Sequence, residues 1–180
     1  FFRKSECSSP FPLLFGVVSF LIFAASAFCS VLSIKRVPFV LFALGGVMLT
    51  SASGVLLFQD GMLAAGKQMQ PLRLLAFLFA GFFLVFLLYT LFFALPFGAS
   101  YLEGGPELVD RGVYALCRHP GVLWLFAFYF CCWLGSGKRG VLYACLLFSL
   151  CDLLYVLLQD RVIFPRTIPG YLFYQKSTPF

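Results

Sequence analysis

Five long stretches of the chain are almost free of charged side chains, and this feature constrains the fold most. Spanning a bilayer takes about 20 apolar residues in a helix, and only helices or closed barrels satisfy their backbone hydrogen bonds in hydrocarbon. Because each stretch is continuously apolar rather than alternating, the sequence predicts an all-α, polytopic membrane protein with about five transmembrane helices. The expected spans are residues 11–34, 37–59, 74–97, 120–137 and 140–158.

The composition indicates that most of the chain is surrounded by the lipid bilayer, which is its main partner. Of the 180 residues, 62% are hydrophobic and 11% are charged, whereas soluble domains carry about 25% charged residues. The 13 Lys and Arg residues fall between the apolar stretches, where they suit anionic lipid headgroups. We therefore expect a multi-pass membrane protein that does not bind nucleic acid.

The cysteines give no sign of a metal site or a disulfide framework. Seven are present, but none forms a Cys-x-x-Cys pair or a Cys/His cluster with metal-ligand spacing. Most lie inside or at the edges of the apolar stretches, where thiols act as small hydrophobic side chains. No metal is predicted.

Two polar segments of unusual content are expected on one side of the membrane. Because two predicted spans, the fourth and the fifth, separate residues 98–119 from residues 159–180, both segments lie on the same side. Together they hold the only histidine, His119, and four tyrosines at positions 101, 114, 171 and 174. The Lys and Arg residues divide six to seven between the sides, and their clustering near these segments favours the cytoplasmic side for the C-terminus. We divide the chain into residues 1–97, with three helices, and residues 98–180, with two helices and the polar tail.

The second region resembles a known enzyme family. The stretch Gly112-Val113-Tyr114-Ala115-Leu116-Cys117-Arg118-His119-Pro120 is similar to the Gly-x-Tyr-x-x-x-Arg-His-Pro signature of the isoprenylcysteine carboxyl methyltransferase and phospholipid methyltransferase superfamily. Gln159 and Asp160 stand where that family has a carboxylate pair, and Tyr171, Tyr174 and Pro179 resemble its Tyr-x-x-Tyr-x-x-x-x-Pro tail. The likeness runs from about residue 103 to residue 180.

The resemblance implies an integral membrane methyltransferase that uses S-adenosylmethionine and an amphiphilic or lipid-like acceptor, of isoprenylcysteine or phospholipid type. It implies a cytosol-facing C-terminal cofactor pocket in which Arg118 and Asp160 carry the catalytic role. The implied cofactor-binding residues are Tyr114, Arg118, His119, Pro120, Gln159, Asp160, Tyr171 and Tyr174.

The chemistry of these residues is compatible with that assignment. Arg118 offers a planar cationic fork suited to a carboxylate, and His119 beside it titrates near neutral pH. Pro120 favours the first turn of the next helix, whose N-terminus attracts negative charge. An amino-acid carboxylate fits there, and Asp160 would face the ammonium or the sulfonium of the cofactor. Methyl transfer then needs alignment and exclusion of water rather than acid-base catalysis.

Departures from the family pattern keep two alternatives open. Trp124 stands where a glycine is expected, and Gln159-Asp160 replaces a pair of glutamates. The chain is then either an inactive member of the fold that binds a lipid or a protein partner, or an enzyme like the sterol reductases with a nicotinamide cofactor.

Separately, Asp152 lies inside the fifth span and is a functional candidate, because an intramembrane carboxylate is costly. The competing interpretation is a protonated side chain bonded to a neighbouring Ser or Tyr.

Overall fold

The structure is a computed structural model that describes residues 10–32, 36–58, 71–94 and 108–180. Its regular elements are helical, as predicted. In chain order they are α1 (Phe11–Val31), α2 (Val37–Leu57), α3 (Pro71–Tyr89), η3 (Thr90–Ala94), α5 (Val113–Leu116), α6 (Pro120–Ser136), α7 (Arg139–Leu158), η5 (Gln159–Ile163), α8 (Phe164–Thr167) and α9 (Tyr171–Ser177). Two of them, η3 and η5, are π-helical.

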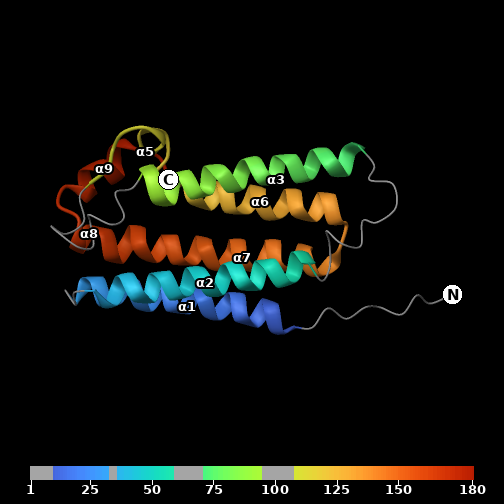
Figure 1. The fold of residues 1–180 in the computed structure, drawn as a ribbon. Helices are drawn as coiled ribbons and strands as arrows, with labels where there is room; N and C mark the ends of the chain where they lie inside the picture. Colours follow the sequence, from blue (N-terminus) through green and yellow to red (C-terminus); the bar gives the residue numbers. More distant parts are fainter. Residues whose placement is uncertain (1–9, 33–35, 59–70, 95–107) are drawn as a thin grey trace.

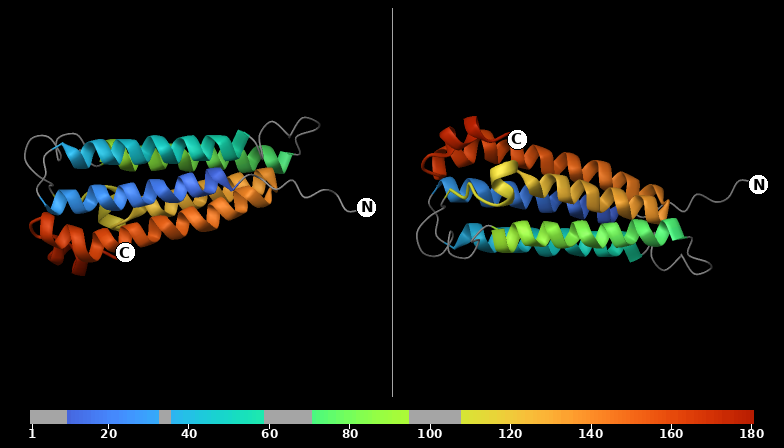
Figure 2. Two further views of the ribbon diagram at one scale, coloured as in Figure 1. Left: turned by 90° about the horizontal axis from the view of Figure 1, so that it is seen from below. Right: turned by 90° about the horizontal axis from the view of Figure 1, so that it is seen from above.

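The five long helices lie side by side, and successive helices along the chain run in opposite directions, so that the neighbours α1 and α7 are parallel (Figure 1). Their main packing partners follow the order α2, α1, α7, α6, α3. The short elements α5, α8 and α9 gather at one end of the bundle, opposite the end where α1 begins (Figures 1 and 2). The bundle therefore has one elaborated end, built by the segments that flank α6 and α7.

Proline and glycine set the ends of the helices. Proline occupies the first or second position of α1, α2, α3 and α6, where its missing N–H costs no intrahelical hydrogen bond and its fixed φ suits the first turn. Gly137 ends α6 with φ +65°, a left-handed conformation that glycine adopts without strain. The turn after Gly137 brings α7 back antiparallel to α6.

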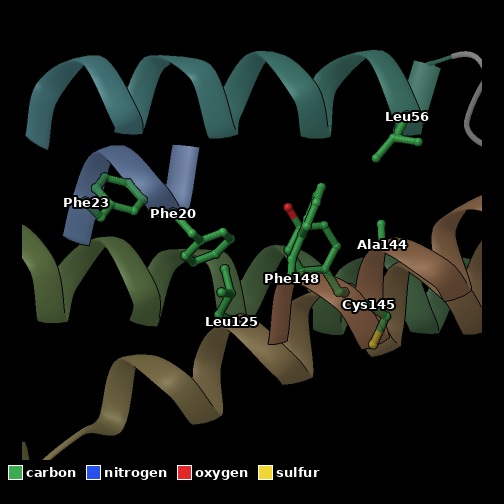
Figure 3. Close-up of a cluster of buried hydrophobic side chains, with 8 residues drawn as sticks. Phe20, Phe23, Leu56, Leu125, Ala144, Cys145 and Phe148 are labelled. Carbon is green, nitrogen blue, oxygen red and sulfur yellow. The ribbon is translucent and has the colours of Figure 1, made fainter. Parts of the chain in front are cut away.

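The largest buried cluster joins four helices. Phe148 of α7 is fully buried, and its ring centre lies 6.3 Å from that of Phe20 of α1 and 5.5 Å from that of Tyr129 of α6. Leu56 of α2 belongs to the same cluster (Figure 3). Gly16 permits a close approach, because a Cβ atom there would overlap the Phe148 ring. Since dispersion contacts drive helix association in lipid, this interlocking of small and large side chains holds α1 on α7.

In the described part of the chain, four helices are long and apolar enough to cross a membrane: Phe11–Val31, Val37–Leu57, Pro71–Phe93 and Arg139–Thr167. This identifies a multi-pass integral membrane protein. The large apolar side chains left exposed on α3, such as Leu78 and Phe82, have lipid as their natural surroundings. The fourth predicted span forms α6, which has 17 residues and is shorter than the other four.

Two predicted boundaries need correction. The third span starts at Pro71 rather than residue 74, because Arg73 is accommodated in the first helical turn. The last span does not end at residue 158; the helical path continues through η5 and α8 to Thr167, because a π-helical turn absorbs the polar residues instead of ending the helix. The division proposed between residues 97 and 98 lies outside the described residues, and helices from both sides of it share the Phe148 cluster.

Candidate functional site

The segments before α6 and after α7 meet at one buried carboxylate. Asp160 lies in η5 with 4% of its surface exposed. Arg118 and His119, which precede α6, and Tyr171 and Gln175 of α9 all donate hydrogen bonds to its side chain. The predicted meeting of the two polar segments is thus present, at the elaborated end of the bundle (Figure 1).

The donors divide unevenly between the two carboxylate oxygens. Oδ1 accepts from Nη1 of Arg118 in an ion pair, from the Tyr171 hydroxyl at 2.6 Å, and from Nε2 of His119 at 3.1 Å. Oδ2 accepts from Nε2 of Gln175 at 2.9 Å. Because both oxygens are already engaged, Asp160 in this arrangement holds protein side chains in place rather than offering a free negative charge.

Arg118 does not use all of its hydrogen-bond donors. Its side chain is 11% exposed, and Nη1 pairs with Asp160. Its Nε is buried and has no hydrogen-bond partner among the described residues. The guanidinium also lies 5.6 Å from the centre of the Phe180 ring, within cation–π range. A buried, unsatisfied N–H on a cation is costly, and because this N–H is enclosed by the protein, an anionic ligand would reach it only after neighbouring side chains move.

His119 caps the start of α6 and is buried against aromatic rings. Its ring lies 6.2 Å from Phe164 in a stacked arrangement and 5.0 Å from Phe180. Burial lowers the pKa of His119, although the hydrogen bond to Asp160 opposes that shift. Since an ionised carboxylate only accepts hydrogen bonds, the neutral imidazole carries its hydrogen on Nε2.

Two tyrosines of α9 point into the site, whereas Tyr101 lies outside the described residues. Tyr171 and Tyr174 lie three residues apart, so they share the inner face of α9. The Tyr174 hydroxyl donates to the backbone carbonyl of Tyr114 at 2.5 Å, which ties α9 to α5. Burial raises the pKa of Tyr174 to about 12, and burial with the hydrogen bond to Asp160 raises the pKa of Tyr171 further. Both hydroxyls therefore act as donors.

Backbone contacts and two π-helical turns fix this geometry. The N–H of Arg118 donates to the carbonyl of Pro179 at 3.0 Å, so the tail is bound directly to the turn before α6. The Tyr114 hydroxyl donates to the carbonyl of Thr90, which opens η3, at 3.2 Å. Asp160 itself lies in η5. Such turns are frequent at functional sites because they reorient side chains and carbonyls within a helix.

Some predicted residues lie outside this cluster. Gln159 donates to the Tyr155 hydroxyl at 2.8 Å instead of joining Asp160. Pro120 is buried at the first position of α6 and contributes to its start. Trp124 packs on Phe83 and Phe86 of α3, with ring centres 6.1 and 5.2 Å away. The indole therefore belongs to the α3–α6 contact and does not fill the polar cluster.

Asp152 is separate from the site. It is half-buried on α7, two turns before Asp160, and forms no hydrogen bond within the described part of the chain. The neighbouring Ser53 and Tyr129 hydroxyls bond to each other. Among the described residues, neither of these two hydroxyls is therefore bonded to Asp152, and both interpretations of this carboxylate stay predictions.

Sequence reasoning missed Gln175 and the aromatic rings of Phe164 and Phe180. Gln175 follows Tyr171 by four residues, and helical spacing would have placed it on the same face of α9. The rings had no signal in a chain with 25 Phe residues. Among the described residues, no group of three or more His, Cys, Asp or Glu side chains is arranged to hold a metal ion.

The arrangement suits binding rather than proton transfer. The hydroxyls stay protonated at neutral pH, the imidazole is neutral, and the carboxylate is saturated with donors. What the cluster offers is a cation held in place by Asp160, with a buried Nε that has no partner among the described residues, beside aromatic surfaces. No known family, curated protein or solved structure matches this chain.

Proposed function

We propose that the protein is an integral membrane methyltransferase that uses S-adenosylmethionine and an amphiphilic or lipid-like acceptor. The observation that carries the proposal is the convergence of the Arg118-His119 turn and the two tail tyrosines around Asp160. These are the residues through which the sequence resembles the isoprenylcysteine and phospholipid methyltransferases. The same residues, widely separated along the chain, share one small site.

In this proposal, the cofactor binds through its carboxylate to Arg118. S-adenosylmethionine carries a carboxylate, and the buried Nε of Arg118 lacks a partner among the described residues. The start of α6 adds a favourable helix dipole for the same negative charge. Stacking surfaces are provided by Phe164, Phe180 and Tyr171.

Each side chain then has a definite task. Arg118 binds the cofactor carboxylate, and Asp160 positions Arg118 by pairing with Nη1. His119 and Tyr171 keep Asp160 ionised and oriented through their hydrogen bonds. When bound, S-adenosylmethionine supplies an activated methyl group that needs no acid-base catalyst. The protein contributes alignment and exclusion of water.

The shortest of the five long helices completes the proposed topology. We infer that α6 also crosses the bilayer, giving five spans, because it packs between α3 and α7 (Figure 1). The site then lies at the cytosolic boundary, where a water-soluble cofactor enters from the cytosol and an amphiphilic acceptor enters from the bilayer.

Calorimetric titration of the purified protein with S-adenosylmethionine in detergent tests the proposal. We expect saturable binding below about 1 mM, the upper range of enzyme substrate constants. Arg118→Lys keeps the charge but removes Nε, so affinity should fall about tenfold or more, the value of a charge-assisted hydrogen bond. Arg111→Lys is the matched control, because Arg111 is exposed near the same end, and it should bind normally.

Two results would contradict the proposal. Absence of binding at millimolar cofactor, from a protein whose melting temperature is normal, would favour an inactive relative of the fold. Binding of the reduced nicotinamide dinucleotide without binding of S-adenosylmethionine would favour the reductase alternative.

A further inference from the structure

The outer face of the C-terminal segment combines positive charge with large apolar side chains. Residues 159–180 contain one acid, Asp160, which is buried and paired. The segment's three cationic side chains are all exposed: Arg161, Arg166 and Lys176. Beside them, Phe173 is 80% exposed and Leu172 is 58% exposed. Within residues 159–180, the exposed surface therefore carries positive charge and unburied apolar area.

Helical spacing places these groups on one face of α9. Tyr171 and Tyr174 face inward and are buried. Lys176 follows Leu172 by four residues and Phe173 by three, so these three side chains project together on the outer face. Arg166 is exposed on α8, which packs against α9. We define the basic–apolar face as Arg166, Leu172, Phe173 and Lys176.

The bilayer that holds the protein is the natural occupant of this face. The segment continues directly from α7, whose candidate span reaches Thr167, so the face lies where the span meets the headgroups. Phe and Leu side chains beside Lys and Arg are typical of interfacial helices, whose apolar side chains enter the acyl boundary while the bases contact phosphates. If this face met only water, the apolar side chain of Phe173 would stay exposed to solvent.

We propose that the basic–apolar face binds anionic phospholipid headgroups of the surrounding bilayer and enriches them next to the Asp160 site. Each base near the membrane surface favours anionic lipid about fivefold. Arg166 and Lys176 supply the attraction, and Phe173 fixes the depth of α9. This lipid binding does not depend on the methyltransferase assignment.

Local quenching of fluorescence tests the enrichment directly. A Phe173→Trp variant is placed in nanodiscs of four parts phosphatidylcholine to one part phosphatidylglycerol, and the background from the two native tryptophans is subtracted using the parent protein. Bromine atoms are carried either by the phosphatidylglycerol or by an equal amount of the phosphatidylcholine. A Leu146→Trp variant is the matched control, because Leu146 is 58% exposed on α7, away from these bases.

We expect brominated phosphatidylglycerol to quench the tryptophan at position 173 at least about twofold more than brominated phosphatidylcholine, with no preference at position 146. Adding Arg166→Gln and Lys176→Gln should abolish the preference but leave total quenching intact. Equal quenching by the two lipids would overturn the proposal. Quenching by neither would also overturn it, because it would place the face in water and favour a soluble acidic partner instead. Inorganic phosphate should not change the result.

Discussion

Two regions along the continuous path of α7 and η5 are held by opposite means. Around Phe148, the helix is fixed by the shapes of side chains from four helices, with Gly16 and Phe148 interlocked. Three turns later, around Asp160, the chain is fixed by one carboxylate and four donors. The first region should be sensitive to changes of side-chain volume, whereas the second should be sensitive to changes of charge.

The polar region depends on Asp160 more than on any other residue. Asp160→Asn removes the charge that compensates buried Arg118, and breaking such a buried pair costs about 3–5 kcal/mol. Unfolding in a denaturing detergent series should show this loss. Asp110→Asn is the control, because Asp110 is exposed and should change stability by less than about 0.5 kcal/mol. Equal, small losses for both variants would contradict a central role for Asp160.

Two tyrosine substitutions sharpen the role of charge within the polar region. Tyr171 donates to a carboxylate, whereas Tyr174 donates to a backbone carbonyl. Hydrogen bonds to charged groups contribute about 1.5–3 kcal/mol and neutral ones about 0.5–1.5 kcal/mol. Tyr171→Phe should therefore destabilise the protein more than Tyr174→Phe in the same unfolding assay. The reverse order would show that the tie from α9 to α5 matters more than the carboxylate.

The core is tested by changing volume without changing charge. A Gly16→Ala methyl group would collide with the Phe148 ring, which is fully buried, and overpacking costs about 1–3 kcal/mol. Combining it with Phe148→Leu should recover part of that loss, which a double-mutant cycle measures. Gly46→Ala is the control, since a Cβ atom at Gly46 would meet no other atom within 4 Å. Purely additive effects would contradict the interlocked contact.

The smallest expected effect is a pH dependence confined to the polar region. Burial lowers the pKa of His119 in the folded protein, so the unfolded chain binds its proton more readily. The contribution of His119 to stability is therefore full above about pH 6.5, its ordinary pKa, and is lost as pH falls below that value. Melting temperatures from pH 8 to 5 should decline for the parent protein and less for His119→Gln. Identical pH profiles would contradict this assignment.

The sequence was sufficient to predict the helices and the meeting of the polar segments. Uninterrupted apolar runs specify spans, and the two predicted spans between Arg118 and Tyr171 put both residues on one side. It was not sufficient to predict what Asp160 does there. Its four donors depend on a π-helical turn in η5, and that turn has no simple sequence signature. For the same reason, Gln159 was expected beside Asp160 but bonds to Tyr155.

Photolabelling tests most directly the central claim that the cluster around Asp160 binds S-adenosylmethionine. The protein is irradiated in the presence of methyl-tritiated S-adenosylmethionine and digested with trypsin. The peptides that carry the tritium label are then identified. We expect label in the peptides covering residues 112–118 or 167–176, removed by excess unlabelled cofactor. Label that is competed away only from peptides of α1 to α3, or no competable label at all, would contradict the claim.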